Sequence, residues 1–160
     1  MTRTLGVAVA VAAFVAAPSL LHAQRRPTTR PELRIDATSA HVPRLELSGG
    51  VAIPIGTYVR LALTAGTGVA RVDDAIRQAG RGDAIIRFEL DPLKQSTRGA
   101  YVGGGLSFLG RDGSRARGYL AVVGGLELKQ RGGWVPAVEA GLGGGARLGV
   151  VLKRAMENWR

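Results

Sequence analysis

The sequence predicts an all-β fold, an up-and-down antiparallel closed β-barrel of about eight strands that follows an N-terminal signal peptide. Two observations lead to this fold class. Residues 44–71 contain two long runs in which apolar side chains occupy every second position, which is the period of a β-strand. The same alternation returns in later segments with turn residues between them, as in an up-and-down all-β fold.

The N-terminus has the organisation of an export signal. Arg3 provides a basic start, residues 5–17 form an apolar core, and Ala23 offers a small residue at a cleavage position. The apolar run stops at Pro18, short of the ~20 residues that a membrane-spanning helix needs. We therefore predict a signal peptide over residues 1–23, a basic linker over 24–32 and one barrel domain over 33–160.

Alternation and turn residues also predict the individual strands. Pro54 cannot donate to a sheet and Gly56 relaxes the backbone, so we expect a turn there rather than one strand over 44–71. An unbroken strand from residue 134 to 152 would be about twice the length that crosses a bilayer, so we also expect a break at the glycines 143–145. If these glycines only bend the chain, the strand count is seven. Residues 72–82 are expected to form a loop. The expected strands are 33–40, 44–53, 58–71, 83–90, 99–109, 117–128, 134–142 and 146–152.

The two faces of the expected strands differ in composition. Leu45, Leu47 and Ile53 share one face, while Glu46 and Ser48 lie on the other. The polar faces mix Gly, Ala, Ser and Thr with occasional Arg and Glu, and they lack the abundance of Lys, Thr, Gln and Glu that is expected of a strand face open to water. This composition indicates a crowded interior. We predict that the apolar faces point towards lipid and the polar faces into the barrel.

Charged residues on the polar faces form the main candidate site. An eight-stranded barrel has an interior just wide enough to be filled by side chains, so charges that point inward should pair across the lumen. Paired carboxylates also serve as catalytic acid and base, but glutamates interleaved with arginines favour mutual neutralisation. The predicted structural network consists of Arg44, Glu46, Arg60, Arg87, Glu89, Arg117, Glu127, Glu139 and Arg147.

The sequence offers few residues for binding a metal, a cofactor, a nucleotide or a nucleic acid. The chain has no cysteine, and His41 is the one histidine after the signal peptide, so we expect no metal and no cofactor. The glycine strings at 103–105 and 141–145 lack the Lys-Ser/Thr ending of a phosphate-binding loop. The net charge is +10, but the arginines are dispersed and not interleaved with aromatic residues, which argues against nucleic acid as a partner.

Several of these features together resemble small outer-membrane β-barrel proteins of the OmpA/OmpX type. They are the signal peptide, the hairpin rhythm, the G-x-x-x-P-x-G-x-Y turn from Gly50 to Tyr58 and the inward Arg/Glu set. The resemblance covers most of the chain after the signal peptide. It implies an outer-membrane location, lipid as the outer partner, a monomer, no small-molecule substrate and a structural or surface-interaction role without enzymatic activity.

Two alternatives remain open at the level of the sequence. A soluble periplasmic β-barrel that binds a small apolar ligand would show the same alternation with its apolar faces turned inward. A lipid-modifying hydrolase embedded in the barrel would rest on His41 and Ser39, with Asp36 as the acidic residue that orients the histidine. A histidine in an exposed loop is the simpler interpretation of His41.

Overall fold

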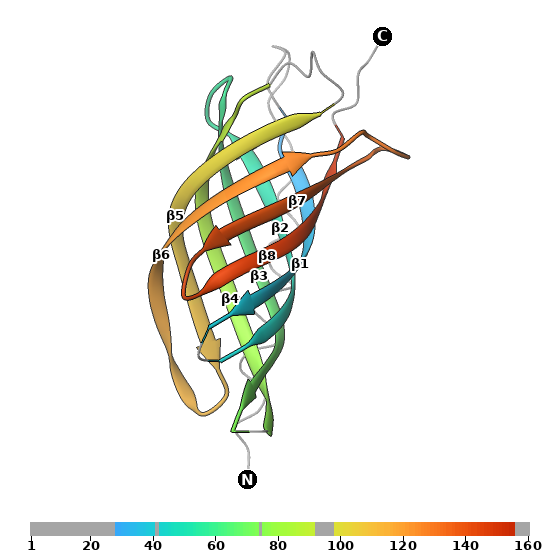
Figure 1. Cartoon of the computed structure of the whole chain (residues 1–160). Helices are drawn as coiled ribbons and strands as arrows, with labels where there is room; N and C mark the ends of the chain where they lie inside the picture. Colours follow the sequence, from blue (N-terminus) through green and yellow to red (C-terminus); the bar gives the residue numbers. More distant parts are fainter. Residues whose placement is uncertain (1–27, 41, 74, 92–97, 156–160) are drawn as a thin grey trace, which may run out of the picture.

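A computed structural model of the chain describes residues 28–40, 42–73, 75–91 and 98–155, and the expected signal peptide lies outside these residues. The described part is a closed antiparallel barrel of eight strands, each paired with the next along the chain, with β8 paired to β1 (Figure 1). This confirms the predicted fold class and strand count. The strands are β1 (Arg30–Ser39), β2 (Arg44–Pro54), β3 (Val59–Val72), β4 (Ala75–Glu89), β5 (Gly99–Arg111), β6 (Ser114–Glu127), β7 (Trp134–Leu142) and β8 (Ala146–Arg154).

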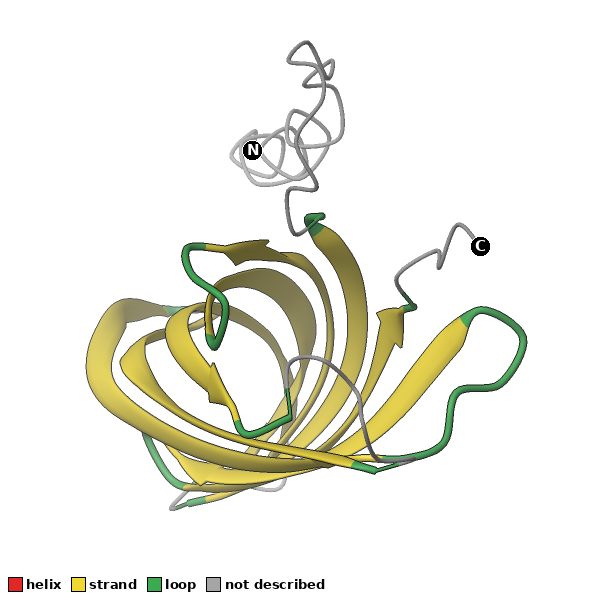
Figure 2. Ribbon diagram, turned by 90° about the horizontal axis from the view of Figure 1, so that it is seen from above, coloured by secondary structure: helices red, strands yellow, loops and turns green. Residues whose placement is uncertain are grey.

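The interior of the barrel holds many charged side chains, whereas most of the large apolar side chains point outward. In β1, buried and exposed residues alternate over the whole strand. Ile35 is 55% exposed, whereas its neighbours Arg34 and Asp36 are 1% and 0% exposed. Figure 2 looks along the barrel and shows the strands curving around its axis. The polarity of the two faces is the one that the sequence predicts. Among the described residues, no helix is long and apolar enough to cross a membrane.

Inward-facing glycines allow neighbouring strands to approach closely, which a narrow barrel requires. A Cβ atom on Gly105 of β5 would overlap the backbone of Ala84 on β4. A Cβ atom on Gly104, which faces outward, would meet no atom closer than the Ala121 carbonyl oxygen at 3.5 Å. The glycine string at 103–105 therefore serves the curvature of the sheet.

Two breaks fall where the sequence places them. β2 ends at Pro54 and β3 begins at Val59, so the Pro-Ile-Gly segment forms the expected turn. β7 ends at Leu142 and β8 begins at Ala146, and the connection uses Gly144 with a positive φ of 78°. Because side chains rarely adopt this backbone conformation, glycine suits a tight turn there.

The prediction of a loop over residues 72–82 is wrong. β3 continues to Val72 and β4 begins at Ala75, so only residues 73 and 74 connect the two strands. The period of two persists in β4, where Ala79 and Arg81 are buried in the lumen. The outward positions between and beside them carry Gln and Gly instead of large apolar residues. The hydropathy pattern disappears there although the strand continues.

The first strand also begins earlier than expected. β1 starts at Arg30 instead of residue 33, and Arg30 and Glu32 are buried in the lumen. Pro31 lies on the exposed face near the start of the strand, a position at which proline is tolerated. The basic, proline-containing composition of this segment is typical of a linker and concealed its role as a strand.

The barrel is taller on one side than on the other. β3, β4, β5 and β6 have 13 to 15 residues, whereas β1, β2, β7 and β8 have 9 to 11. The β3–β4 and β5–β6 hairpins therefore extend beyond the β1–β2 and β7–β8 connections at the lower end of Figure 1. We call this end, bounded by residues 42–44, 109–119 and 143–145, the mouth. The opposite end, which contains residues 30 and 154, is the terminal end.

Candidate functional site

A network of ion pairs fills the lumen, and seven of the eight strands contribute charged side chains to it. β5 adds the hydroxyl groups of Tyr101 and Ser107, which donate hydrogen bonds to Glu139 and Asp83. Seven carboxylates and seven basic side chains take part, so the charges of this set balance. The carboxylates are Glu32, Asp36, Glu46, Asp83, Glu89, Glu127 and Glu139, and the basic residues are Arg30, Arg34, Arg60, Arg81, Arg87, Arg147 and Lys153.

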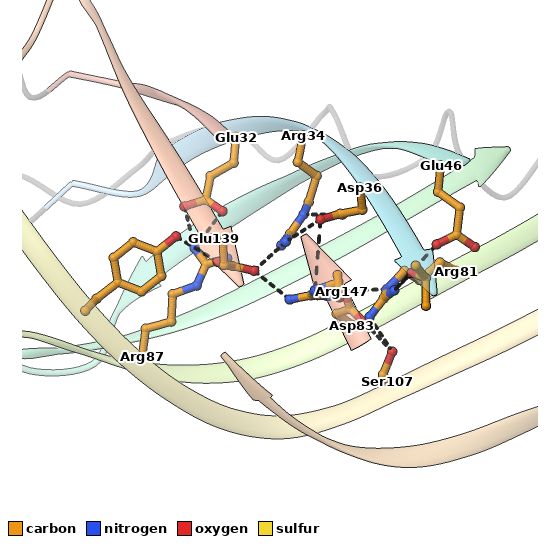
Figure 3. A network of polar contacts seen from close by, with 12 residues as sticks. Glu32, Arg34, Asp36, Glu46, Arg81, Asp83, Arg87, Ser107, Glu139 and Arg147 are labelled. Carbon is orange, nitrogen blue, oxygen red and sulfur yellow. Dashed lines mark hydrogen bonds and ion pairs between the residues drawn. The ribbon is translucent and has the colours of Figure 1, made fainter. Parts of the chain in front are cut away.

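Glu139 of β7 lies at the centre of the network (Figure 3). Its Oε1 atom accepts hydrogen bonds from the guanidinium groups of Arg34 and Arg147. Its Oε2 atom accepts one from the Tyr101 hydroxyl at 2.7 Å and lies 3.2 Å from Nη2 of Arg87. Glu139 is 0% exposed, so water does not reach it. A buried carboxylate needs this degree of compensation, because its desolvation is costly.

Two aspartates extend the network from Glu139 towards the mouth. Arg34 Nε donates to Asp36 Oδ2 at 2.7 Å, and Arg147 Nη1 donates to Asp83 Oδ2 at 2.9 Å. Arg81 of β4 also holds Asp83, with its Nε atom 2.9 Å from Oδ2. Arg34 and Arg147 each therefore bridge Glu139 and an aspartate, which connects the individual pairs into one continuous structure (Figure 3).

Further pairs continue the network towards the terminal end. Arg87 Nη1 donates to both carboxylate oxygens of Glu32 at 2.8 Å. The guanidinium group of Arg87 also lies 5.1 Å from the centre of the Tyr101 ring. Gly125 of β6 leaves the space for that ring, since a Cβ atom there would overlap it. Two pairs lie beyond: Lys153 with Glu127 at 3.0 Å, and Arg60 with Glu89 at 2.7 Å.

The structure brings most of the residues proposed from the sequence into this lumen. Arg44 lies at the mouth end, 3.9 Å from Glu46. Arg117 does not join the network: it is exposed, and none of the described carboxylates lies within ion-pair distance of it. The β5–β6 hairpin projects past the network, so Arg117 lies at the mouth. The residues of the proposed set that belong to the lumenal network are Glu46, Arg60, Arg87, Glu89, Glu127, Glu139 and Arg147.

Sequence reasoning missed half of the lumenal set. Arg34 and Asp36 share the polar face of β1, and their alternation with Leu33 and Ile35 was sufficient to include them. Arg81 was excluded because its segment was interpreted as a loop. The other missed residues are Arg30, Glu32, Asp83 and Lys153.

Ser39 and Asp36, two of the residues considered for catalysis, do not come together. Ser39 is exposed at the end of β1, whereas Asp36 points into the lumen and accepts hydrogen bonds from Arg34. His41 lies outside the described residues. In the described part of the chain, no group of three or more His, Cys, Asp or Glu residues is arranged to hold a metal ion.

A cavity of about 250 Å³ opens at the mouth. Arg44 of β2 and three arginines of the β5–β6 hairpin, Arg111, Arg115 and Arg117, contribute to its walls. Leu109 and Tyr119 add apolar surface. None of the residues that line the cavity is acidic, in contrast to the balanced lumen below it.

Comparison with solved structures identifies the same architecture in transmembrane barrels. The crystal structure of Neisserial surface protein A superposes with a TM-score of 0.61 and 12% sequence identity, covering 80% of this chain and 96% of that one. A de novo designed transmembrane β-barrel superposes with a TM-score of 0.56 and 11% identity, covering 82% of this chain and 97% of that one. No protein-family model and no curated protein matches the sequence. The chain thus has the fold of the small outer-membrane β-barrels that its sequence resembles.

Proposed function

We propose that this chain is an integral outer-membrane β-barrel protein with a non-enzymatic, structural or surface-interaction role. The distribution of its side chains carries the proposal. Leu47, Val122 and Leu148 are each at least 60% exposed and belong to a set of exposed apolar residues on every strand, whereas the lumen holds buried charged residues. Contiguous apolar surface of this extent is unfavourable in water and favourable in lipid.

The dimensions of the barrel support the same location. β1, β7 and β8 have 9 or 10 residues, the length of a tilted strand that crosses a bilayer. Tyr58 and Phe88 are exposed near the terminal end and Phe108 is exposed nearer the mouth. Aromatic residues of transmembrane barrels gather at the two membrane interfaces. We infer that the longer β3–β6 strands extend beyond the bilayer at the mouth.

Lipid is the partner that this surface suits, and the barrel suits a monomer. Every strand of the closed sheet has a neighbour on both sides, so no strand edge is left for pairing with another chain. The soluble alternative requires an apolar interior, whereas the lumen holds paired charges. The hydrolase alternative has no support in the geometry of Ser39 and Asp36.

Two exposed isoleucines provide a matched test of the lipid-facing surface. Ile35 is in the middle of β1, and Ile76 is 76% exposed near the tip of the β3–β4 hairpin. An arginine on the lipid face near the bilayer centre costs about 2 to 4 kcal/mol, and the cost falls to about 0 to 1 near the interfaces. We expect Ile35→Arg to lower the folding yield in lipid vesicles strongly and Ile76→Arg to leave it near the wild-type yield.

The location itself is tested by fractionation of cells that express the full chain. We expect it in the outer-membrane fraction, with a gel mobility that changes on heating because the folded barrel is compact. A wild-type protein that is stable and monomeric in buffer without detergent would contradict the proposal. Equal folding yields for Ile35→Arg and Ile76→Arg would also contradict it.

A further inference from the structure

The arginines at the mouth lack the carboxylate partners that the lumenal arginines have. Of the four, Arg44 has a distant pair with Glu46 at 3.9 Å and donates to the Gly110 carbonyl oxygen at 3.2 Å. Among the described residues, no carboxylate lies within ion-pair distance of Arg111, Arg115 or Arg117. Three uncompensated guanidinium groups therefore surround one cavity.

An irregularity in the β5–β6 hairpin accompanies this concentration of arginines. Leu109 pairs with Arg117, but Arg111 pairs with Ser114, so β6 contains one additional residue between these pairs. Such β-bulges near the rims of barrels change the direction of side chains. Arg115 lies in the bulged segment and Arg117 lies next to it, and both line the cavity together with Arg44 of the shorter side of the barrel.

The cavity also has an apolar part that limits what fits inside. Leu109 is 4% exposed, and Tyr119 beside it is half-buried and carries a hydroxyl group. Gly144 of the β7–β8 connection forms part of the wall, and a Cβ atom there would overlap the Leu109 side chain. The absence of a side chain at Gly144 thus keeps the wall from closing on Leu109 and Tyr119.

We propose that the mouth cavity binds a phosphate-bearing anion. Guanidinium groups bind phosphate oxygens through two parallel hydrogen bonds, and several arginines can share one phosphate group. The volume of about 250 Å³ accommodates a pyrophosphate or a phosphorylated headgroup and is below the usual range for larger ligands, about 300 to 1,000 Å³. The phosphate belongs either to a soluble compound or to a lipid headgroup that reaches the mouth over its low side.

Two double variants remove the same charge from opposite ends of the barrel. Arg115→Gln with Arg117→Gln removes two charges from the mouth cavity. Lys129→Gln with Arg131→Gln removes two exposed charges from the β6–β7 connection at the terminal end. All four residues are exposed, so we expect both double variants to fold as the wild type does, which the change of gel mobility on heating verifies.

Binding is measured by calorimetric titration of the full chain in nonionic detergent, so the test does not depend on the proposed cellular location. One arm uses sodium pyrophosphate and the other uses short-chain phosphatidic acid in mixed micelles, with phosphatidylcholine as the uncharged-headgroup control. We expect the mouth variant to weaken binding by about tenfold or more, because charged hydrogen bonds are lost. The terminal-end variant should bind within about twofold of the wild type, as expected for charges remote from the site.

Each outcome decides the proposal. The site is supported if the wild type and the terminal-end variant bind one of the phosphate probes and the mouth variant does not. The probe that the wild type binds more tightly then indicates whether the phosphate comes from a soluble compound or from a lipid. The proposal is overturned if the wild type binds neither probe. It is also overturned if both double variants weaken binding equally, since the attraction is then a property of the whole positive surface.

Discussion

The same residue type has opposite surroundings in two regions of this barrel. In the lumen, Arg34 and Arg147 each contact Glu139 and an aspartate, and both are buried. At the mouth, Arg115 and Arg117 are exposed, and none of the described carboxylates pairs with them. An arginine inside the barrel balances a charge that folding has buried, whereas an arginine at the mouth retains a charge that a ligand can neutralise.

This difference shows that the net charge of the chain does not indicate where its unneutralised positive side chains lie. The chain carries a formal charge of +10. The lumenal set is balanced, with each carboxylate near at least one basic group, so the surplus lies elsewhere. The arginine-lined mouth holds part of that surplus. Four predictions test or refine the comparison.

The largest effect is expected for Glu139→Gln. This substitution leaves Arg34, Arg87 and Arg147 without their shared carboxylate in a region that water does not reach. Breaking a buried pair of this kind costs about 3 to 5 kcal/mol. Urea unfolding of the barrel in detergent measures the loss. Asp73→Asn at the exposed β3–β4 turn is the control, and equal urea midpoints for the two variants would contradict an enclosed charged lumen.

A smaller loss is expected for Gly125→Ala, which tests whether the lumen has spare space. The added methyl group would overlap the ring of Tyr101, a residue that is 1% exposed and whose hydroxyl group donates a hydrogen bond to Glu139. Overpacking of a filled interior costs about 1 to 3 kcal/mol. The adjacent Gly124→Ala is a matched control, because a Cβ atom there would meet no atom within 4 Å. A larger loss of stability for Gly124→Ala would indicate that the faces are assigned incorrectly.

Glu127→Gln is expected to cost less than Glu139→Gln. The Glu127 side chain is 9% exposed near the terminal end, and its partner Lys153 also lies 3.7 Å from the centre of the Tyr101 ring. Because the remaining positive charge keeps one favourable contact, the expected loss is about 1 to 2 kcal/mol. The same urea experiment measures it. A loss as large as that of Glu139→Gln would show that burial is uniform along the barrel axis.

The smallest effect is expected for Arg117→Gln. An exposed side chain without a carboxylate partner contributes little to stability, so the free energy of unfolding should stay within about 0.5 kcal/mol of the wild-type value. Arg34→Gln is the comparison in the lumen, where the same chemical change breaks buried hydrogen bonds to Asp36 and Glu139. Similar losses for the two variants would remove the distinction between the two regions.

The period of two predicted more of the fold than of the charge network. It predicted the closed barrel, the eight strands and the outward direction of Leu45 and Leu47, because the outer face and the lumen of a barrel require different chemistry at alternate positions. It failed in residues 75–82, where the strand leaves the expected lipid band and its outward side chains need not be apolar. Hydrogen-bonded pairing with the neighbouring strand sets the boundaries of a strand, and the hydropathy pattern of a single segment does not indicate this pairing.

The partners within the lumen depend on geometry that a single strand does not contain. Parity places Arg147 and Glu139 inside the barrel, but strand tilt and register decide that Arg147 also reaches Asp83 of β4. Tyr101 contacts Glu139 from β5, although no ladder joins β5 to β7. These contacts cross the lumen, so the sequence pattern indicates which side chains are inside and leaves their pairing undetermined.

The position of Glu139 has a consequence for the order of assembly. Its bond to Arg34 joins residues 105 positions apart, and the first and last strands must pair to close the sheet. Contacts across such long sequence separations form late, after a large loss of chain entropy. In the outer-membrane location that we propose, a chain whose sheet is still open would retain charges without partners, which is a costly state in hydrocarbon. We therefore expect closure of the sheet and neutralisation of the charges to be completed together, so that a barrel with one missing or mispaired strand would be poorly stable in the bilayer.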